Sequence, residues 1–171
     1  MWNSRLSHPE LPVQILLMRH GSAAWDAPTD ELRPLTERGE LEVASAGEYL
    51  KRMGWIPDAI CRSPFLRARQ TADILNQPWR LAIEESVALT PEASLAQLET
   101  LLGNYASFER VLLVGHNPLF SNAFNYLCGD ANTRWGLQPA SQALFVIDII
   151  GQACGTALSL RHFPSYESNA L

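Results

Sequence analysis

The sequence predicts an α/β protein, a three-layer α/β/α sandwich built around a mostly parallel central sheet. Two apolar runs, at residues 13–18 and 111–114, are typical of strands that are buried on both faces of a sheet. Helical patterns alternate with such runs along the chain, and this alternation is typical of a parallel sheet that is covered by helices.

The length of 171 residues fits a single domain, because a domain usually holds about 100–200 residues. We expect this domain to span residues 13–163, with a flexible N-terminal tail at 1–12 and a C-terminal tail at 164–171. No segment between the expected elements is long enough to form a separate lid domain.

Composition and charge narrow the classes of partner and compartment. The formal net charge of −5, without any run rich in Lys and Arg, argues against nucleic acid as the main partner. No stretch approaches the ~18 apolar residues of a membrane span. The chain has three cysteines, an odd number, and no two of them form a CxxC pair. This pattern fits a reducing compartment better than a framework of disulfides. We therefore expect a cytoplasmic monomer that makes no membrane contact.

Capping residues, prolines and glycines indicate where the elements begin and end. Thr36 is a suitable N-cap for a helix that runs to Met53, and Gly54 follows it. Ser-Pro at 63–64 and Thr-Pro at 90–91 each combine a capping side chain with a proline suited to the first helical turn. Pro78 is expected to end the helix that starts at 63–64, and a further helix is expected from Asn117-Pro118 to Gly129. The remaining strands are expected at 56–61, 80–83, 143–150 and 157–162, and the last two form a hairpin.

Two of the predicted strands end in a histidine. Arg19-His20-Gly21 follows the first apolar run, and His116 follows the second. Ligands of open α/β sheets bind outside the carboxyl ends of the strands, so both histidines leave the sheet where a ligand would lie. Gly21 lets the backbone turn and approach that ligand. Arg67, in the first turn of a predicted helix, is free to point toward the same edge.

Arg19, His20, Arg67 and His116 together would make a cationic pocket, which attracts a dianionic phosphate. An arginine holds phosphate through a planar two-point contact, while an imidazole attacks phosphorus. The nearby positive charges lower the pKa of His20 and keep it neutral, with a lone pair for in-line attack. His116, in contact with the bound dianion, is expected to be protonated and to stabilise charge on the phosphate oxygens.

Several stretches resemble motifs of the histidine phosphatase superfamily, the phosphoglycerate mutase-like proteins, and in particular its SixA-type branch of phosphohistidine phosphatases. They are Leu17-Met-Arg-His-Gly21, Arg33-Pro-Leu-Thr36, Ser63-Pro-Phe-Leu-Arg-Ala68 with Gln70-Thr71, Leu89-Thr-Pro91, and His116 with Pro118. They occur in family order and span most of the chain. The resemblance implies that His20 is the nucleophile that becomes phosphorylated, and that Arg19, Arg67 and His116 form the phosphate pocket. It also implies that the substrate is a signalling protein that carries a phosphohistidine.

The proton donor is the role that the sequence leaves open. Many superfamily members carry a glutamate where this chain has residues 87–89. Glu92 is the nearest acid, and Asp26 and Asp30, in the loop after the first motif, are the other candidates. The loop at 22–36 is too short for a lid, so we expect an open pocket, which suits a phosphorylated side chain on a protein better than a small metabolite.

Other interpretations remain open to test. Cys61 and Arg67 satisfy the C-x5-R spacing of cysteine-dependent phosphatases, but the loop between them has no glycine and Pro64 removes a backbone donor. We therefore expect Cys61 to be a small apolar strand residue. The same pocket would suit a general phosphomonoesterase of the superfamily, or a phosphate-dependent regulatory binding module without turnover. The histidines and cysteines lack metal-ligand spacing, so we expect no metal and no other cofactor. Among the tryptophans, Trp25 is expected to overhang the pocket.

Overall fold

The computed structural model describes residues 12–129 and 134–167. Six strands form one sheet: β1 (Val13–Arg19), β2 (Ala59–Arg62), β3 (Ile83–Glu85), β4 (Arg110–Gly115), β5 (Gln142–Ile147) and β6 (Thr156–Arg161). The helices are α1 (Glu37–Met53), α2 (Leu66–Asn76), α3 (Leu95–Gly103) and α4 (Leu119–Cys128), with short 3-10 turns η1 (Asp30–Leu32) and η2 (Val87–Leu89). The predicted α/β fold, with no additional domain, is confirmed.

The order of the strands in the sheet is β3-β2-β4-β1-β5-β6. The first four are parallel, while β5 is antiparallel to β1 and β6 is antiparallel to β5. In the central pair, Arg19 of β1 lies opposite Gly115 of β4. His20 and His116 come next in sequence, so they leave neighbouring strands at the carboxyl edge of the sheet.

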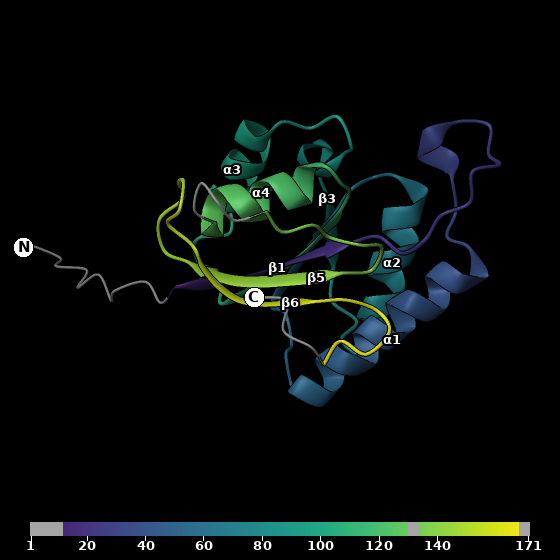
Figure 1. Cartoon of the computed structure of the whole chain (residues 1–171), viewed down its shortest axis with the longest axis horizontal. Coiled ribbons are helices and arrows are strands. Elements are labelled where there is room, and N and C mark those ends of the chain that lie inside the picture. Colours follow the sequence, from purple (N-terminus) through teal and green to yellow (C-terminus); the bar gives the residue numbers. More distant parts are fainter. Residues whose placement is uncertain (1–11, 130–133, 168–171) are drawn as a thin grey trace, which may run out of the picture.

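Each face of the sheet has its own apolar core, because side chains alternate along a strand. On one face, Ile15 and Leu17 of β1 pack with residues of α3 and α4. On the other face, Leu16 and Met18 pack with residues of α1 and α2. Figure 1 shows α3 and α4 above the strands and α1 below them. These four β1 side chains are at most 2% exposed, as the apolar run predicts.

The predicted ends of α1 are confirmed. The Thr36 hydroxyl accepts a hydrogen bond from Gly39 N at 3.0 Å. Gly54 follows the last turn with φ 64, a left-handed conformation that favours glycine.

Two other predicted helix starts are wrong. α2 begins after Phe65 rather than at 63–64. α3 begins after Ser94 rather than at 90–91, because Ser94 and Gln97 form a reciprocal capping box. The Ser94 hydroxyl accepts from Gln97 N, and the Gln97 side chain accepts from Ser94 N, so two backbone donors are satisfied together.

Strand boundaries differ from the prediction where residues are exposed. β3 occupies 83–85 instead of 80–83, since Arg80 has φ 53 and cannot continue an extended strand. Its three residues are half-buried or exposed, and such a strand has no apolar run to mark it. β2 begins at 59 rather than 56, while the predicted hairpin is present as β5 and β6 with ends at 142–147 and 156–161.

The predicted C-terminal tail begins too early at residue 164. Tyr166 is 1% exposed, and its hydroxyl donates to Ala140 O at 2.9 Å, so the packed domain extends beyond 163. The predicted N-terminal tail, apart from Pro12, lies outside the described residues, as do residues 168–171. None of the helices in the described ranges has the length and hydropathy that a membrane crossing requires.

Candidate active site

A cavity of about 360 Å³ opens at the carboxyl edge of the sheet, where β1 and β4 end. Arg19, His20, Arg67 and His116 all line it, so the structure brings the four predicted residues together. The rest of the lining comes from Ser22, Ala23, Trp25, Arg33, Pro91, Asn117 and Pro139. His20, Arg67 and His116 are 9%, 4% and 1% exposed, so they form the floor of the pocket rather than its rim.

Both ring nitrogens of His20 have a neighbour that fixes the tautomer. Nδ1 lies 2.7 Å from Gly21 O, and because a carbonyl oxygen only accepts, Nδ1 carries the proton. Nε2 therefore holds the lone pair, and it accepts a hydrogen bond from Arg67 Nε at 3.2 Å. This tautomer makes Nε2 the ring atom that can attack an electrophile.

All three nitrogens of the Arg67 guanidinium are engaged. Nε donates to His20, Nη1 donates to the Asp30 carbonyl oxygen at 2.6 Å, and Nη2 donates to Asp30 Oδ2 at 3.0 Å. The other carboxylate oxygen of Asp30 accepts from Arg33 Nη1 at 2.9 Å. Asp30 therefore bridges two guanidinium groups that line the pocket.

His116 lies beside His20, with the ring centroids 5.0 Å apart. Its Nε2 is 2.8 Å from the Ser63 hydroxyl, and its buried Nδ1 has no hydrogen-bond partner among the described residues. Arg19 donates from Nη1 to Leu137 O at 2.7 Å, while its buried Nε also lacks a partner there. An unpaired buried polar atom costs about 1–3 kcal/mol, so an anion bound between these two side chains would offset a cost that the free site carries.

Burial keeps both histidines neutral in the free protein. Desolvation lowers the pKa of His20 to about 3, and the neighbouring arginine charges act in the same direction, against a hydrogen bond to the backbone. Desolvation also lowers the pKa of His116 to about 2, with further lowering from His20 and Arg67. Neutral His20 agrees with the sequence-based expectation. A protonated His116 requires the added negative charge of a bound phosphate.

The structure gives a different reason for Gly21 than the sequence did. The sequence suggested that this glycine lets the backbone approach a ligand, whereas in the structure it lets the backbone approach α1. A Cβ at Gly21 would lie 2.6 Å from Gly39 O, and a Cβ at Gly39 would lie 2.0 Å from Ser22 O. The buried carboxylate of Glu42 accepts from Ser22 N and from the Ser22 hydroxyl, both at 2.9 Å. These contacts fix the turn that carries His20 against α1.

Three other residues considered from the sequence lie outside the cavity lining. Glu92 is exposed and lies outside the cavity lining, although its neighbour Pro91 belongs to it. Asp26 is exposed as well. Cys61 is 1% exposed on β2, and burial raises the pKa of its thiol, so it lacks the thiolate character of a nucleophile. Trp25 does line the mouth of the cavity.

Two contributors were missed from the sequence. Arg33 lines the pocket and pairs with Asp30, and the buried Ser63 hydroxyl contacts His116. The available signal was their presence in the stretches that resemble superfamily motifs. Within residues 12–129 and 134–167, no group of three or more His, Cys, Asp or Glu side chains is arranged to hold a metal ion.

Residues 15–101, from β1 to α3, match the model of the histidine phosphatase superfamily (branch 1). The chain belongs to this superfamily. It is 34% identical over 122 residues to the phosphohistidine phosphatase SixA of Escherichia coli strain K12, which covers 68% of this chain and 74% of that protein. It is 30% identical over 133 residues to a SixA homologue of Haemophilus influenzae, covering 70% of this chain and 80% of the homologue.

Solved structures agree with this membership. A structure of the protein histidine phosphatase SixA complexed with tungstate is similar with a TM-score of 0.79 and 28% identity, covering 88% of this chain and 97% of that one. A putative alpha-ribazole-5′-P phosphatase from Escherichia coli has a TM-score of 0.68 at 16% identity, covering 85% and 94%, and that likeness shows the fold alone. The protein is thus a hydrolase of the histidine phosphatase superfamily that resembles SixA.

Proposed function

We propose that this hydrolase removes the phosphoryl group from a phosphohistidine of a signalling protein, through a covalent intermediate on His20. The observation that carries the proposal is the lone pair of His20 Nε2, which lies at the floor of an open pocket between cationic side chains. No acidic side chain is among the described residues that line this pocket. The pocket is therefore built to attract a phosphate and to supply a nitrogen nucleophile.

The reaction proceeds in two displacements. First, His20 Nε2 forms a bond to phosphorus while the P–N bond of the substrate breaks, and the departing imidazole takes one proton from solvent. Second, water attacks the phosphoryl group on His20, releases inorganic phosphate and returns one proton to solvent. The sum is one phosphohistidine and one water converted to histidine and phosphate, with neutral His20 regenerated.

The cations of the pocket stabilise the charge on the transferred group. Arg19 Nε and His116 Nδ1 are buried without partners among the described residues, and both are available to the equatorial oxygens. Removal of one such preorganised donor typically costs about 10²–10³-fold in rate. His116 gains its proton as the dianion enters, because a bound negative charge favours the imidazolium form.

The proton donors available suit a P–N bond better than a P–O bond. Expulsion of an alkoxide benefits from a positioned general acid, which contributes about 10²–10⁴-fold. Burial raises the pKa of Asp30, but its hydrogen bonds with Arg33 and Arg67 outweigh this and hold that pKa below its usual range. Asp30 is therefore ionised and cannot donate, and Glu92 is exposed outside the lining. An imidazole leaves readily once solvent protonates it, so it needs neither acid.

A comparison of substrates tests the proposal. We expect kcat/KM for a phosphohistidine protein to exceed kcat/KM for a phosphoserine peptide and for 3-phosphoglycerate by about 10²-fold or more, because only the esters need a general acid. The variant Glu92→Gln should leave both rates nearly unchanged, because Glu92 is exposed outside the cavity lining, and His20→Ala is the inactive control.

Two outcomes would contradict the proposal. Equal rates on phosphohistidine and on esters, with the ester rate abolished in Glu92→Gln, would make the protein a general phosphomonoesterase. Tight binding of phosphohistidine without release of phosphate would make it a regulatory binding module.

A further inference from the structure

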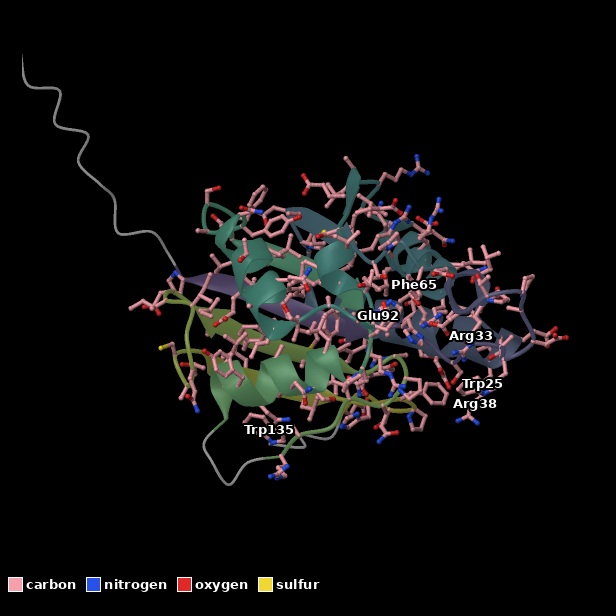
Figure 2. The ribbon with its side chains drawn as sticks, turned by 90° about the horizontal axis from the view of Figure 1, so that it is seen from above. Trp25, Arg33, Arg38, Phe65, Glu92 and Trp135 are labelled. Atoms are coloured by element: carbon pink, nitrogen blue, oxygen red, sulfur yellow. The ribbon has the colours of Figure 1, made fainter. Side chains whose placement is uncertain are left out.

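Trp25 differs in exposure from the other tryptophans that the structure describes. It is 85% exposed, yet it lines the mouth of the cavity that holds His20. Trp55 is 8% exposed, Trp135 packs on Phe124, and Trp79 packs against the core between the sheet and α1 and α2. Figure 2 shows Trp25 and Arg33 close together at one end of the molecule, far from Trp135. The fold therefore places a large aromatic surface in solvent at the pocket entrance.

Arg33 fixes the orientation of this aromatic ring. Its guanidinium carbon lies 3.9 Å from the centroid of the Trp25 ring. The guanidinium is itself held, since Nε donates to Ala24 O at 2.7 Å and Nη1 donates to Asp30 at 2.9 Å. One face of the indole is thus covered by a fixed cation, while the 85% exposure means that the rest of the ring is open.

The loop that carries Trp25 is tied down at both ends. Ala24 N donates to Pro34 O at 2.8 Å, and Ala23 pairs with Leu35 in an isolated bridge. Leu35 N donates to the Gln70 side chain at 2.8 Å, which links the loop to α2. An aromatic group presented on such a fixed loop loses little conformational entropy when it binds a partner.

In-line attack defines where the leaving group lies. His20 Nε2 is at the pocket floor, so the atom that departs from phosphorus lies on the opposite side, toward the mouth. The more exposed part of the lining includes the apolar side chains of Ala23, Trp25, Pro91 and Pro139, beside polar side chains such as those of Arg33 and Asn117. A cationic floor with aromatic and proline side chains nearer the solvent suits a phosphate joined to a flat, weakly polar ring.

We propose that Trp25, held by Arg33, forms a subsite for the planar aromatic leaving group, the imidazole ring of phosphohistidine. This inference rests on the proposed function and extends it from the phosphate to the ring that carries it. Offset stacking of two aromatic rings strengthens binding by about three- to tenfold beyond simple contact. Among substrates with a P–N bond, the subsite therefore favours those in which the nitrogen belongs to an aromatic ring.

Two P–N substrates separate the role of the ring from the role of the phosphate. Free phosphohistidine carries an imidazole, whereas phosphoramidate has the same type of bond and no ring. We expect Trp25→Ala to raise KM for phosphohistidine about three- to tenfold and to leave KM for phosphoramidate within about twofold. Trp25→Phe should restore most of the loss. Leu32→Ala, which removes a 52% exposed side chain from the same loop, should change neither value.

Each other result overturns the subsite. An equal change in KM for both substrates, or no change in KM for either, would show that Trp25 does not bind the imidazole ring. An effect confined to a phosphorylated protein, absent with free phosphohistidine, would assign Trp25 to contact with the protein surface instead. If the wild-type protein hydrolyses both phosphoramidate and phosphohistidine, these outcomes for the Trp25 variants contradict the subsite and leave the proposed function standing. If it hydrolyses neither, the proposed function fails and the subsite fails with it.

Discussion

Asp30 occupies both terminal nitrogens of Arg67. Its carbonyl oxygen accepts from Nη1 at 2.6 Å and its carboxylate accepts from Nη2 at 3.0 Å, while Arg67 Nε donates to His20 Nε2 at 3.2 Å. The guanidinium thus covers the lone pair of the proposed nucleophile and is neutralised by a carboxylate of the same chain. A phosphate that binds to Arg67 has to replace Asp30 and uncover His20.

Removal of the Asp30 charge should therefore strengthen phosphate binding. We expect Asp30→Asn to lower the inhibition constant of inorganic phosphate about two- to fivefold, because an ion pair with a half-exposed carboxylate is worth about 0.2–1 kcal/mol. The measurement is product inhibition of turnover. Asp26→Asn removes an exposed charge from the same loop and should have no effect. Weaker inhibition in Asp30→Asn would mean that Asp30 orients Arg67 for phosphate.

The lowered histidine pKa values predict a loss of stability in mild acid. In the unfolded chain each histidine takes up a proton near pH 6.5, whereas His20 and His116 in the folded protein remain neutral until about pH 3 and 2. The unfolded state binds more protons below pH 6.5, so the free energy of unfolding falls as the pH drops, by up to about 1.4 kcal/mol per pH unit for each histidine.

Urea unfolding between pH 7 and pH 5, in buffer without phosphate, measures this dependence. We expect His116→Asn to reduce the slope by the contribution of one proton, since asparagine does not titrate. A slope equal to that of the wild type would show that His116 titrates alike in the folded and unfolded states.

Arg67→Lys should not behave as a conservative change. The guanidinium of Arg67 uses three nitrogens in one plane, and a lysine ammonium cannot reproduce a planar two-point contact with phosphate. We expect kcat/KM to fall on the order of 10²-fold, comparable to the loss of one oxyanion donor. Arg69→Lys, on the same helix and paired with Glu85 at 3.4 Å, is the control that should retain activity. A nearly unchanged rate in Arg67→Lys would place Arg67 outside the phosphate site.

Ser63 should matter through His116. Its hydroxyl is buried and lies 2.8 Å from His116 Nε2, and a hydrogen bond to a charged group contributes about 1.5–3 kcal/mol. We expect Ser63→Ala to lower kcat/KM about tenfold or more, because His116 bears its charge once the phosphate dianion is bound. Ser45→Ala, whose hydroxyl donates to Leu41 O within α1, is the control. An unchanged kcat/KM in Ser63→Ala would contradict this role.

The parts of the fold that follow local rules could be predicted from the sequence. β1 and β4 are each built on an apolar run, at residues 15–18 and 111–114, and α1 has a cap, an apolar stripe and a terminal glycine, so each element is specified by its own residues. The predicted start of α2 is wrong because the Ser63 hydroxyl accepts from Phe65 N in a tight turn and contacts His116, 53 positions away, while the helix begins after Phe65. No local pattern distinguishes a serine that caps a helix from one that closes a turn before it and contacts a distant side chain.

The candidate site also has a part that could be predicted from the sequence and a part that could not. His20 and His116 stand at strand ends and Arg67 at a helix start, so the topology alone brings them together. The contacts of Asp30 with Arg33 and Arg67 depend on η1 folding back onto α2. That return is made by a loop without periodicity, so the sequence left Asp30 as one of three possible acids.

Trapping of the covalent intermediate tests the mechanism most directly. The protein is mixed with a phosphohistidine substrate that carries labelled phosphate, quenched within the first turnover, and digested to locate the label. We expect the label on His20, stable in base and labile in acid, unchanged in Cys61→Ser and absent in an inactive His20→Ala. A label on Cys61, or turnover that survives in His20→Ala, would contradict the mechanism.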